Sequence, residues 1–142
     1  KYDVEDTAVV NFVFKSGALG TMSVSDTIVS PWSYELTAGE NPAYPITNQS
    51  AYYIGGTKSS IQFPNYKEWY NKKERSWWKP ILHKDESTRE SRYTLTNQIN
   101  HLCDVVNKKT KPKITGEDGL LSLKIFAAII KSAKTGKKVK IK

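Results

Sequence analysis

The chain has 142 residues, of which 22 are Lys or Arg and 14 are Asp or Glu, so its formal charge is +8. Apolar residues make up 38% of the sequence, enough for a hydrophobic core at this length, so we exclude a disordered chain and expect a single domain over residues 1–142. No apolar run approaches the ~20 residues of a membrane-spanning helix and no signal peptide is recognisable, so we expect a cytoplasmic protein. The first residue is Lys1 rather than Met, and we expect a piece of a longer protein.

The basic residues are concentrated after residue 50. Residues 1–50 hold two basic and six acidic side chains, whereas the rest of the chain holds 20 basic and eight acidic ones. Only three of the basic residues are Arg, and proteins that read nucleic-acid sequence use the planar Arg fork on base edges. We therefore interpret the Lys excess as solvated surface, and we expect no specific nucleic-acid partner and no membrane partner.

Strand patterns dominate the first half of the sequence. Residues 4–14 carry β-branched and aromatic residues in partial alternation, and residues 15–18 predict a hairpin turn. The antiparallel partner strand is expected at residues 19–26. We expect a third strand at residues 34–37 and a strand–turn–strand unit over residues 51–64.

The second half changes from strands to helices. A last short strand pair is expected at residues 68–70 and 77–78. Apolar positions then follow one helical stripe over residues 95–106, and a second helix is expected over residues 115–136, between an N-cap Thr and a C-cap Gly. Residues 139–141 predict a short edge strand. Strands followed by helices predict an α+β fold, an open, mostly antiparallel β-sheet with helices packed on one face.

The sequence lacks the motifs of a self-contained enzyme. Gly55-Gly56 is not followed by the third glycine and the helix of a dinucleotide-binding turn. His83 and His101 have no partner at metal-ligand spacing, and Cys103 lies on the apolar stripe, where a buried, unreactive thiol is expected. We therefore expect no catalytic, cofactor-binding or metal-binding residue in this chain.

Residues 25–45 are the stretch that most resembles a binding site. They place Trp, Tyr, Asn and carboxylate side chains in loops that three prolines stiffen. Aromatic faces stack on sugar rings while amides and carboxylates fix hydroxyl groups, so this composition suits a small polyhydroxylated ligand. The alternative is that Trp32 and Tyr44 fill the core and that the prolines only shape the loops.

A series of short motifs spans nearly the whole chain in a fixed order: Val-Glu-Asp-Thr at 4–7, Ser-Pro-Trp at 30–32, Gly-Glu-Asn-Pro at 39–42, Tyr-Tyr-Ile-Gly-Gly-Thr-Lys-Ser-Ser-Ile at 52–61, Ser-Trp-Trp at 76–78 and Thr-Gly-Glu-Asp-Gly-Leu at 115–120. In order and spacing they resemble the C-terminal domain of the Gfo/Idh/MocA oxidoreductases. The resemblance implies a parent enzyme whose N-terminal Rossmann domain binds NAD or NADP. It also implies that this chain supplies the substrate pocket and an oligomer interface on the exposed face of its sheet.

The resemblance assigns this chain to the substrate side of the reaction. The family's Gly-rich turn, its Glu-Lys-Pro motif and its Asp-x-x-x-His helix have no counterpart here, so we expect the chain alone to bind no nucleotide and to be inactive. By the resemblance, the candidate substrate-binding residues are Trp32 for stacking, Asn41 and Tyr44 for hydroxyl contacts, and Glu40 as a hydrogen-bond acceptor. Glu40 as a solvated loop carboxylate remains the alternative for that residue.

Two hypotheses follow. The first is the substrate-binding and oligomerisation domain of an NAD(P)-dependent sugar or polyol dehydrogenase. The second is a non-catalytic binding or assembly module that associates through its exposed sheet face.

Overall fold

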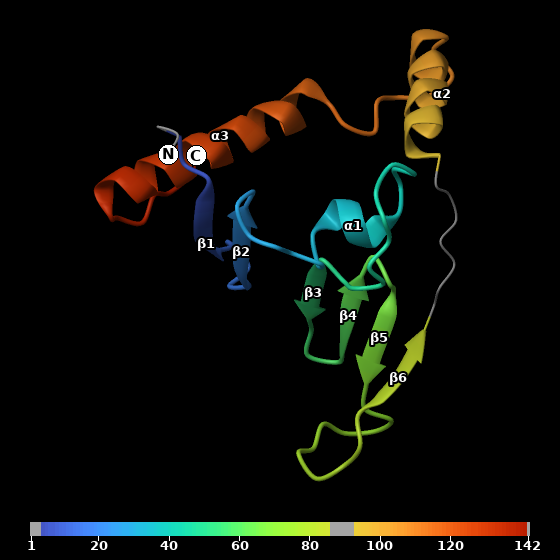
Figure 1. Cartoon of the computed structure of the whole chain (residues 1–142), viewed down its shortest axis with the longest axis vertical. Coiled ribbons are helices and arrows are strands. Elements are labelled where there is room, and N and C mark those ends of the chain that lie inside the picture. The colour runs from blue at the N-terminus through green and yellow to red at the C-terminus, as the bar shows by residue number, and fades with distance from the viewer. Residues whose placement is uncertain (1–3, 86–92, 142) are drawn as a thin grey trace. The chain divides into compact units, whose positions relative to one another are not determined.

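The computed structural model describes residues 4–85 and 93–141, which form six strands and three helices (Figure 1). The chain divides into two compact units, one made of Lys1–Ile28 and Asn100–Lys142 and the other of Val29–Ile99. All pairing between the described strands is antiparallel, in one two-stranded and one four-stranded sheet. The predicted α+β class is therefore confirmed. The expectation of one domain over residues 1–142 stays a prediction.

The two-stranded sheet is the predicted hairpin. β1 (Thr7–Val13) pairs with β2 (Leu19–Ser25), and the Phe14 N–H donates to the Ala18 carbonyl at 2.9 Å across the connecting turn. Gly17 in this turn has φ 87°, a conformation that glycine adopts without a steric penalty. The hairpin and its turn are confirmed.

The long helix of the first unit, α3 (Gly116–Thr135), has the predicted caps at both ends. The Thr115 hydroxyl accepts from the Asp118 N–H at 3.3 Å, and the Asp118 carboxylate accepts from the Thr115 N–H at 2.8 Å. These two bonds satisfy donors that a helix N-terminus leaves open, and the Thr115 N–H and hydroxyl hold the pKa of Asp118 below its usual range. Gly136, at φ 65°, ends the helix.

Two expectations for the last third of the chain were wrong. Residues 139–141 are not a strand, because none of the described strands pairs with them and two apolar residues among lysines do not make a ladder. α2 (Thr94–Val106) confirms the predicted helix, but Cys103 on its apolar stripe is exposed rather than buried. The helical period correctly predicted that these apolar residues share one side of α2, yet it could not predict whether other side chains bury them.

The second unit holds a meander of four strands in chain order: β3 (Tyr52–Gly55), β4 (Ser59–Phe63), β5 (Lys67–Tyr70) and β6 (Leu82–Asp85). The strand–turn–strand unit over residues 51–64 is thus confirmed. The expected partner of β5 at residues 77–78 was wrong, because that segment lies in the loop before β6. β6 pairs with β5 instead, and the Lys84–Glu68 ion pair at 3.0 Å joins the two strands.

The strand expected at residues 34–37 is a short helix, α1 (Tyr34–Ala38). Gly39 follows it at φ 64°, which closes the turn in the left-handed conformation. The Thr37 hydroxyl donates to the Tyr34 carbonyl at 3.1 Å and is fully buried. Four residues of alternation are too few to distinguish a strand from one helical turn. Gly39, which adopts the left-handed conformation that ends a helix, favours the helix here.

Packing in the second unit centres on aromatic rings. No aliphatic or aromatic side chain in the described part of the chain is fully buried. The rings of Tyr34 in α1 and Phe63 in β4 stack with centroids 6.1 Å apart, while Tyr52 and Tyr66 lie within 6.0 and 5.0 Å of the Phe63 ring. This cluster fixes α1 on one face of the four-stranded sheet.

Candidate functional site

The candidate site is the loop that follows α1. Tyr34 reaches across the helix end, and its hydroxyl donates to Glu40 Oε1 at 2.8 Å. Burial, and then the hydrogen bond to the Glu40 carboxylate, raise the pKa of Tyr34 to about 12. The phenol therefore stays protonated, and remains a donor, into the alkaline range where an ordinary tyrosine ionises. Glu40 is held in one orientation, and among the described residues its second oxygen has no hydrogen-bond partner.

Asn41 shapes the next turn of the loop. Its side-chain Oδ1 accepts from the Ala43 N–H at 3.0 Å, and its backbone carbonyl accepts from the Tyr44 N–H at 3.2 Å. Such Asx turns fix a short loop without further packing. The amide oxygen of Asn41 is therefore used within the loop, which leaves its NH₂ group for a ligand, and Tyr44 is held with 46% of its surface exposed.

The loop is tied back to α1 by Thr47. Its N–H donates to the Leu36 carbonyl at 3.0 Å, and its hydroxyl donates to the Pro31 carbonyl. One residue therefore joins the segment before α1, the helix itself and the end of the loop. The loop that carries Glu40, Asn41 and Tyr44 is closed at both ends.

Three of the four sequence-predicted residues come together here. Glu40, Asn41 and Tyr44 line an open groove of about 480 Å³, with Gly39, Pro42, Ile46 and residues 93–96 as its other walls. Trp32 is not among the lining residues and is 54% exposed. The groove therefore combines a fixed carboxylate, an amide and a phenol with apolar walls.

Comparison with known protein families decides what this chain is. The sequence model of an oxidoreductase family, described as its C-terminal alpha/beta domain and named for Gfo, Idh and MocA, matches residues 1–141. The chain belongs to the Gfo/Idh/MocA oxidoreductases. No curated protein and no solved structure matches the chain.

The glycine pair of this Gfo/Idh/MocA domain does not fit a dinucleotide. Gly55 and Gly56 join two antiparallel strands, and the Gly56 N–H donates to the Ser59 carbonyl at 2.9 Å. A Cβ atom on Gly56 would lie 2.7 Å from that carbonyl oxygen, so the hairpin itself requires the glycine. A dinucleotide turn leads from a strand into a helix whose N-terminus faces the pyrophosphate, and this turn leads into a strand.

His101 of the Gfo/Idh/MocA domain serves local structure. His101 Nε2 accepts from the Lys113 N–H at 3.1 Å, which ties the loop after α2 back to that helix. Residues 4–85 and 93–141 contain no group of three or more His, Cys, Asp or Glu side chains that could hold a metal ion. None of their helices is long and apolar enough to cross a membrane.

Sequence reasoning missed Tyr34 and Thr47 as parts of the site. Both act through bonds that depend on α1, and the strand expected at residues 34–37 would direct Tyr34 differently. The available signal was Gly39, because a glycine directly before Glu40 indicates a helix end and a sharp turn. A helix that ends there brings residues 34 and 40 together.

Proposed function

We propose that this Gfo/Idh/MocA domain binds the sugar or polyol substrate of an NAD(P)-dependent dehydrogenase. The observation that carries the proposal is the 2.8 Å hydrogen bond from Tyr34 to Glu40 at the edge of the groove. A carboxylate held in place by a protonated phenol is a preorganised acceptor for ligand hydroxyl groups.

Each candidate residue has a distinct role in this proposal. Glu40 accepts from a substrate hydroxyl through its second oxygen, and the Asn41 amide donates to another. The Tyr44 ring and hydroxyl, half exposed in the groove, pack on and bond to the sugar. Trp32 lies outside the groove lining, so its stacking role requires the substrate to extend past the loop toward Pro31.

The chemistry belongs to the rest of the parent enzyme. In this proposal an N-terminal Rossmann domain binds NAD or NADP, supplies the catalytic groups and faces the groove. The parent enzyme acts in the cytoplasm. This chain by itself binds no nucleotide and is inactive. The sheet face opposite α1 is the proposed homo-oligomer interface, since Tyr53 of β3 lies on that face and is 67% exposed.

The experiment uses the parent protein that contains this chain. It is purified with its cofactor and screened against sugars and polyols for reduction of NAD and NADP. We expect turnover of at least one polyhydroxylated compound, and we expect Glu40→Gln to weaken the binding of that compound. A folded, cofactor-bound parent that turns over none of them would contradict the proposal.

The second candidate, a non-catalytic assembly module, is favoured by one observation. Large apolar side chains are exposed on both sheets and both long helices, including Leu19, Tyr53, Leu95, Leu123 and Phe126. Surfaces of this kind are normally covered by a partner. Association of the parent without cofactor binding or turnover would favour this module over the dehydrogenase.

A further inference from the structure

The charge of the groove comes from Glu40. Among the described residues that line the groove, Glu40 has the one formally charged side chain, and the others are tyrosines, an amide, hydroxyls and apolar groups. The Tyr34 hydroxyl fixes the carboxylate at Oε1, and Oε2 has no hydrogen-bond partner among the described residues. The groove therefore offers a ligand one oxygen of a negatively charged group in a set position.

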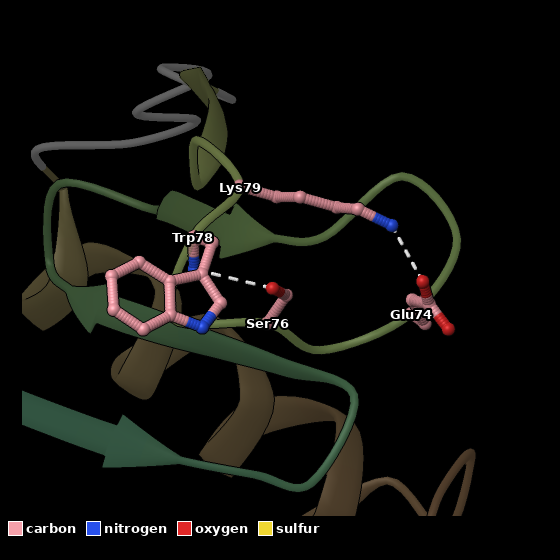
Figure 2. Close-up of polar contacts among 4 residues, drawn as sticks. All are labelled: Glu74, Ser76, Trp78 and Lys79. Carbon is pink, nitrogen blue, oxygen red and sulfur yellow. Dashed lines mark hydrogen bonds and ion pairs between the residues drawn. The ribbon is translucent and has the colours of Figure 1, made fainter.

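Glu40 keeps its charge, unlike carboxylates of this chain that pair with lysine. Figure 2 shows such a pair in the loop between β5 and β6, where Glu74 Oε1 lies 2.5 Å from Lys79 Nζ. The two charges of that pair cancel. The partner of Glu40 is instead the phenol of Tyr34, which stays neutral because its pKa is raised to about 12. The hydrogen bond thus orients the Glu40 carboxylate and leaves its full negative charge at the groove.

The sequence keeps basic side chains out of the segment that builds this site. Lys and Arg make up 22 of the 142 residues, yet no Lys, Arg or His lies between Lys15 and Lys58. Residues 29–57, which include α1 and the groove loop, carry two carboxylates, Glu35 and Glu40, and no cation. Sites for carboxylate and phosphate groups are normally built with Arg or Lys. This segment instead repels anions and attracts cations.

The groove also presents aromatic rings to a cation. Tyr44 and Tyr93 both line it, and both keep exposed surface. A carboxylate together with tyrosine rings is suited to a protonated amine, because the carboxylate accepts a charge-assisted hydrogen bond and the ring face attracts positive charge. The Asn41 amide and the Tyr44 hydroxyl serve the hydroxyl groups of the same ligand.

We propose that Glu40 makes the groove selective for amino sugars and aminopolyols over neutral polyols, and that it excludes carboxylated and phosphorylated sugars. The preferred substrate places its ammonium group on Glu40 Oε2, where a neutral polyol places a hydroxyl. This selectivity rests on the function proposed above and narrows the substrate within that class.

The test measures the binding of three acyclic compounds to the cofactor-bound parent. Glucamine, sorbitol and gluconate share one carbon skeleton and configuration and differ at one carbon, which carries an ammonium, a hydroxyl or a carboxylate group at neutral pH. Calorimetric titration gives the Kd of each. We expect glucamine to bind at least about tenfold more tightly than sorbitol, because charged hydrogen bonds are stronger, and gluconate at least about tenfold more weakly, because like charges repel.

Three variants assign this order to the charge of Glu40. In Glu40→Gln the three Kd values should lie within about threefold of one another, because the charge is gone. Glu35→Gln, at an exposed residue of α1 outside the groove lining, is the matched control and should keep the wild-type order. Tyr34→Phe releases the carboxylate without removing its charge, so it should weaken binding and still keep the order. Circular dichroism checks that each variant is folded.

The outcomes separate this selectivity from the proposed function. If the parent turns over a polyol of another configuration, the amino and carboxylate analogues of that polyol replace the three compounds. A parent that turns over polyols but binds the amino and carboxylate forms equally overturns the selectivity alone. So does a preference that survives in Glu40→Gln, or one that Tyr34→Phe abolishes as fully as Glu40→Gln does. A parent that binds no polyol overturns the proposed function as well.

Discussion

Tyr34 and Glu40 form the hydrogen bond on which the candidate site depends, with the phenol donating to Glu40 Oε1 at 2.8 Å. The same Tyr34 ring stacks on Phe63 at an interplanar angle of 14°. The carboxylate of a surface loop is therefore held by a ring that packs against β4. Because this ring packs on the sheet, the hydrogen bond holds the Glu40 carboxylate in place at the edge of the groove.

The first prediction concerns the titration of Tyr34. Since burial and Glu40 both disfavour the phenolate, its pKa is raised to about 12 from the ordinary 10.0. An absorbance titration should show one tyrosine still protonated at about pH 11, and this late component should vanish in Tyr34→Phe. In Glu40→Gln it should move to lower pH but stay above the ordinary value, because the burial remains.

The same shift has a consequence for stability. Above pH 10 the unfolded chain releases the Tyr34 proton while the folded chain retains it up to about pH 12. The contribution of this group is therefore complete below pH 10 and is lost as the pH rises through that window. Urea unfolding of the wild type and Tyr34→Phe should show the difference. A wild-type Tyr34 that titrates together with the other tyrosines would contradict it.

The second prediction separates the hydroxyl of Tyr34 from its ring. Tyr34→Phe removes the bond to Glu40 and should lower the free energy of unfolding by about 1 kcal/mol. Tyr34→Ala also removes the ring from the cluster with Phe63 and should cost about 2 kcal/mol, less than a fully buried aromatic because Tyr34 is only half-buried. The control is Tyr53→Ala, on the opposite face of β3, with little expected effect. Equal losses in Tyr34→Ala and Tyr53→Ala would exclude the cluster as a source of stability.

The third prediction compares a glycine within α3, Gly119, with the glycine that follows it, Gly136. Gly119 lies in the first turns of the helix with open space around its Cβ position, so Gly119→Ala should stabilise the chain by about 0.5–1 kcal/mol. Gly136 ends the helix at φ 65°, so Gly136→Ala should destabilise it by about 1 kcal/mol. Thermal unfolding followed by circular dichroism compares the two variants. If both substitutions raise, or both lower, the midpoint temperature of unfolding, the C-terminal end of α3 does not lie at Gly136.

Local chemistry made much of the fold predictable. The β1–β2 hairpin follows from alternation and a turn glycine, and α3 follows from Thr115 and Gly136, whose conformations depend on neighbours in sequence. β6 was not predictable in this way. Its residues, Leu-His-Lys-Asp, have weak strand propensity, and they form a strand by joining the antiparallel ladder of β5, where Lys84 lies opposite Glu68 and Asp85 opposite Lys67.

The site was predictable in composition and not in geometry. Glu40, Asn41 and Tyr44 stand out in the sequence because they cluster in a proline-rich loop, and the structure brings them to one groove. What orients them is Tyr34 and Thr47, whose bonds depend on a five-residue helix and on a contact 16 positions along the chain. No local pattern specifies contacts of that kind.

The most direct test of the proposed substrate site compares two matched substitutions in the parent enzyme. Glu40→Gln removes the charge that Tyr34 holds at the groove, whereas Glu35→Gln makes the same change at an exposed residue of α1 outside the groove lining. For the sugar or polyol that the parent turns over, KM should rise about tenfold or more in Glu40→Gln, since hydrogen bonds to a charged partner are worth ~1.5–3 kcal/mol. Glu35→Gln should leave KM unchanged. Equal KM values in the two variants would contradict the assignment of this loop to the substrate.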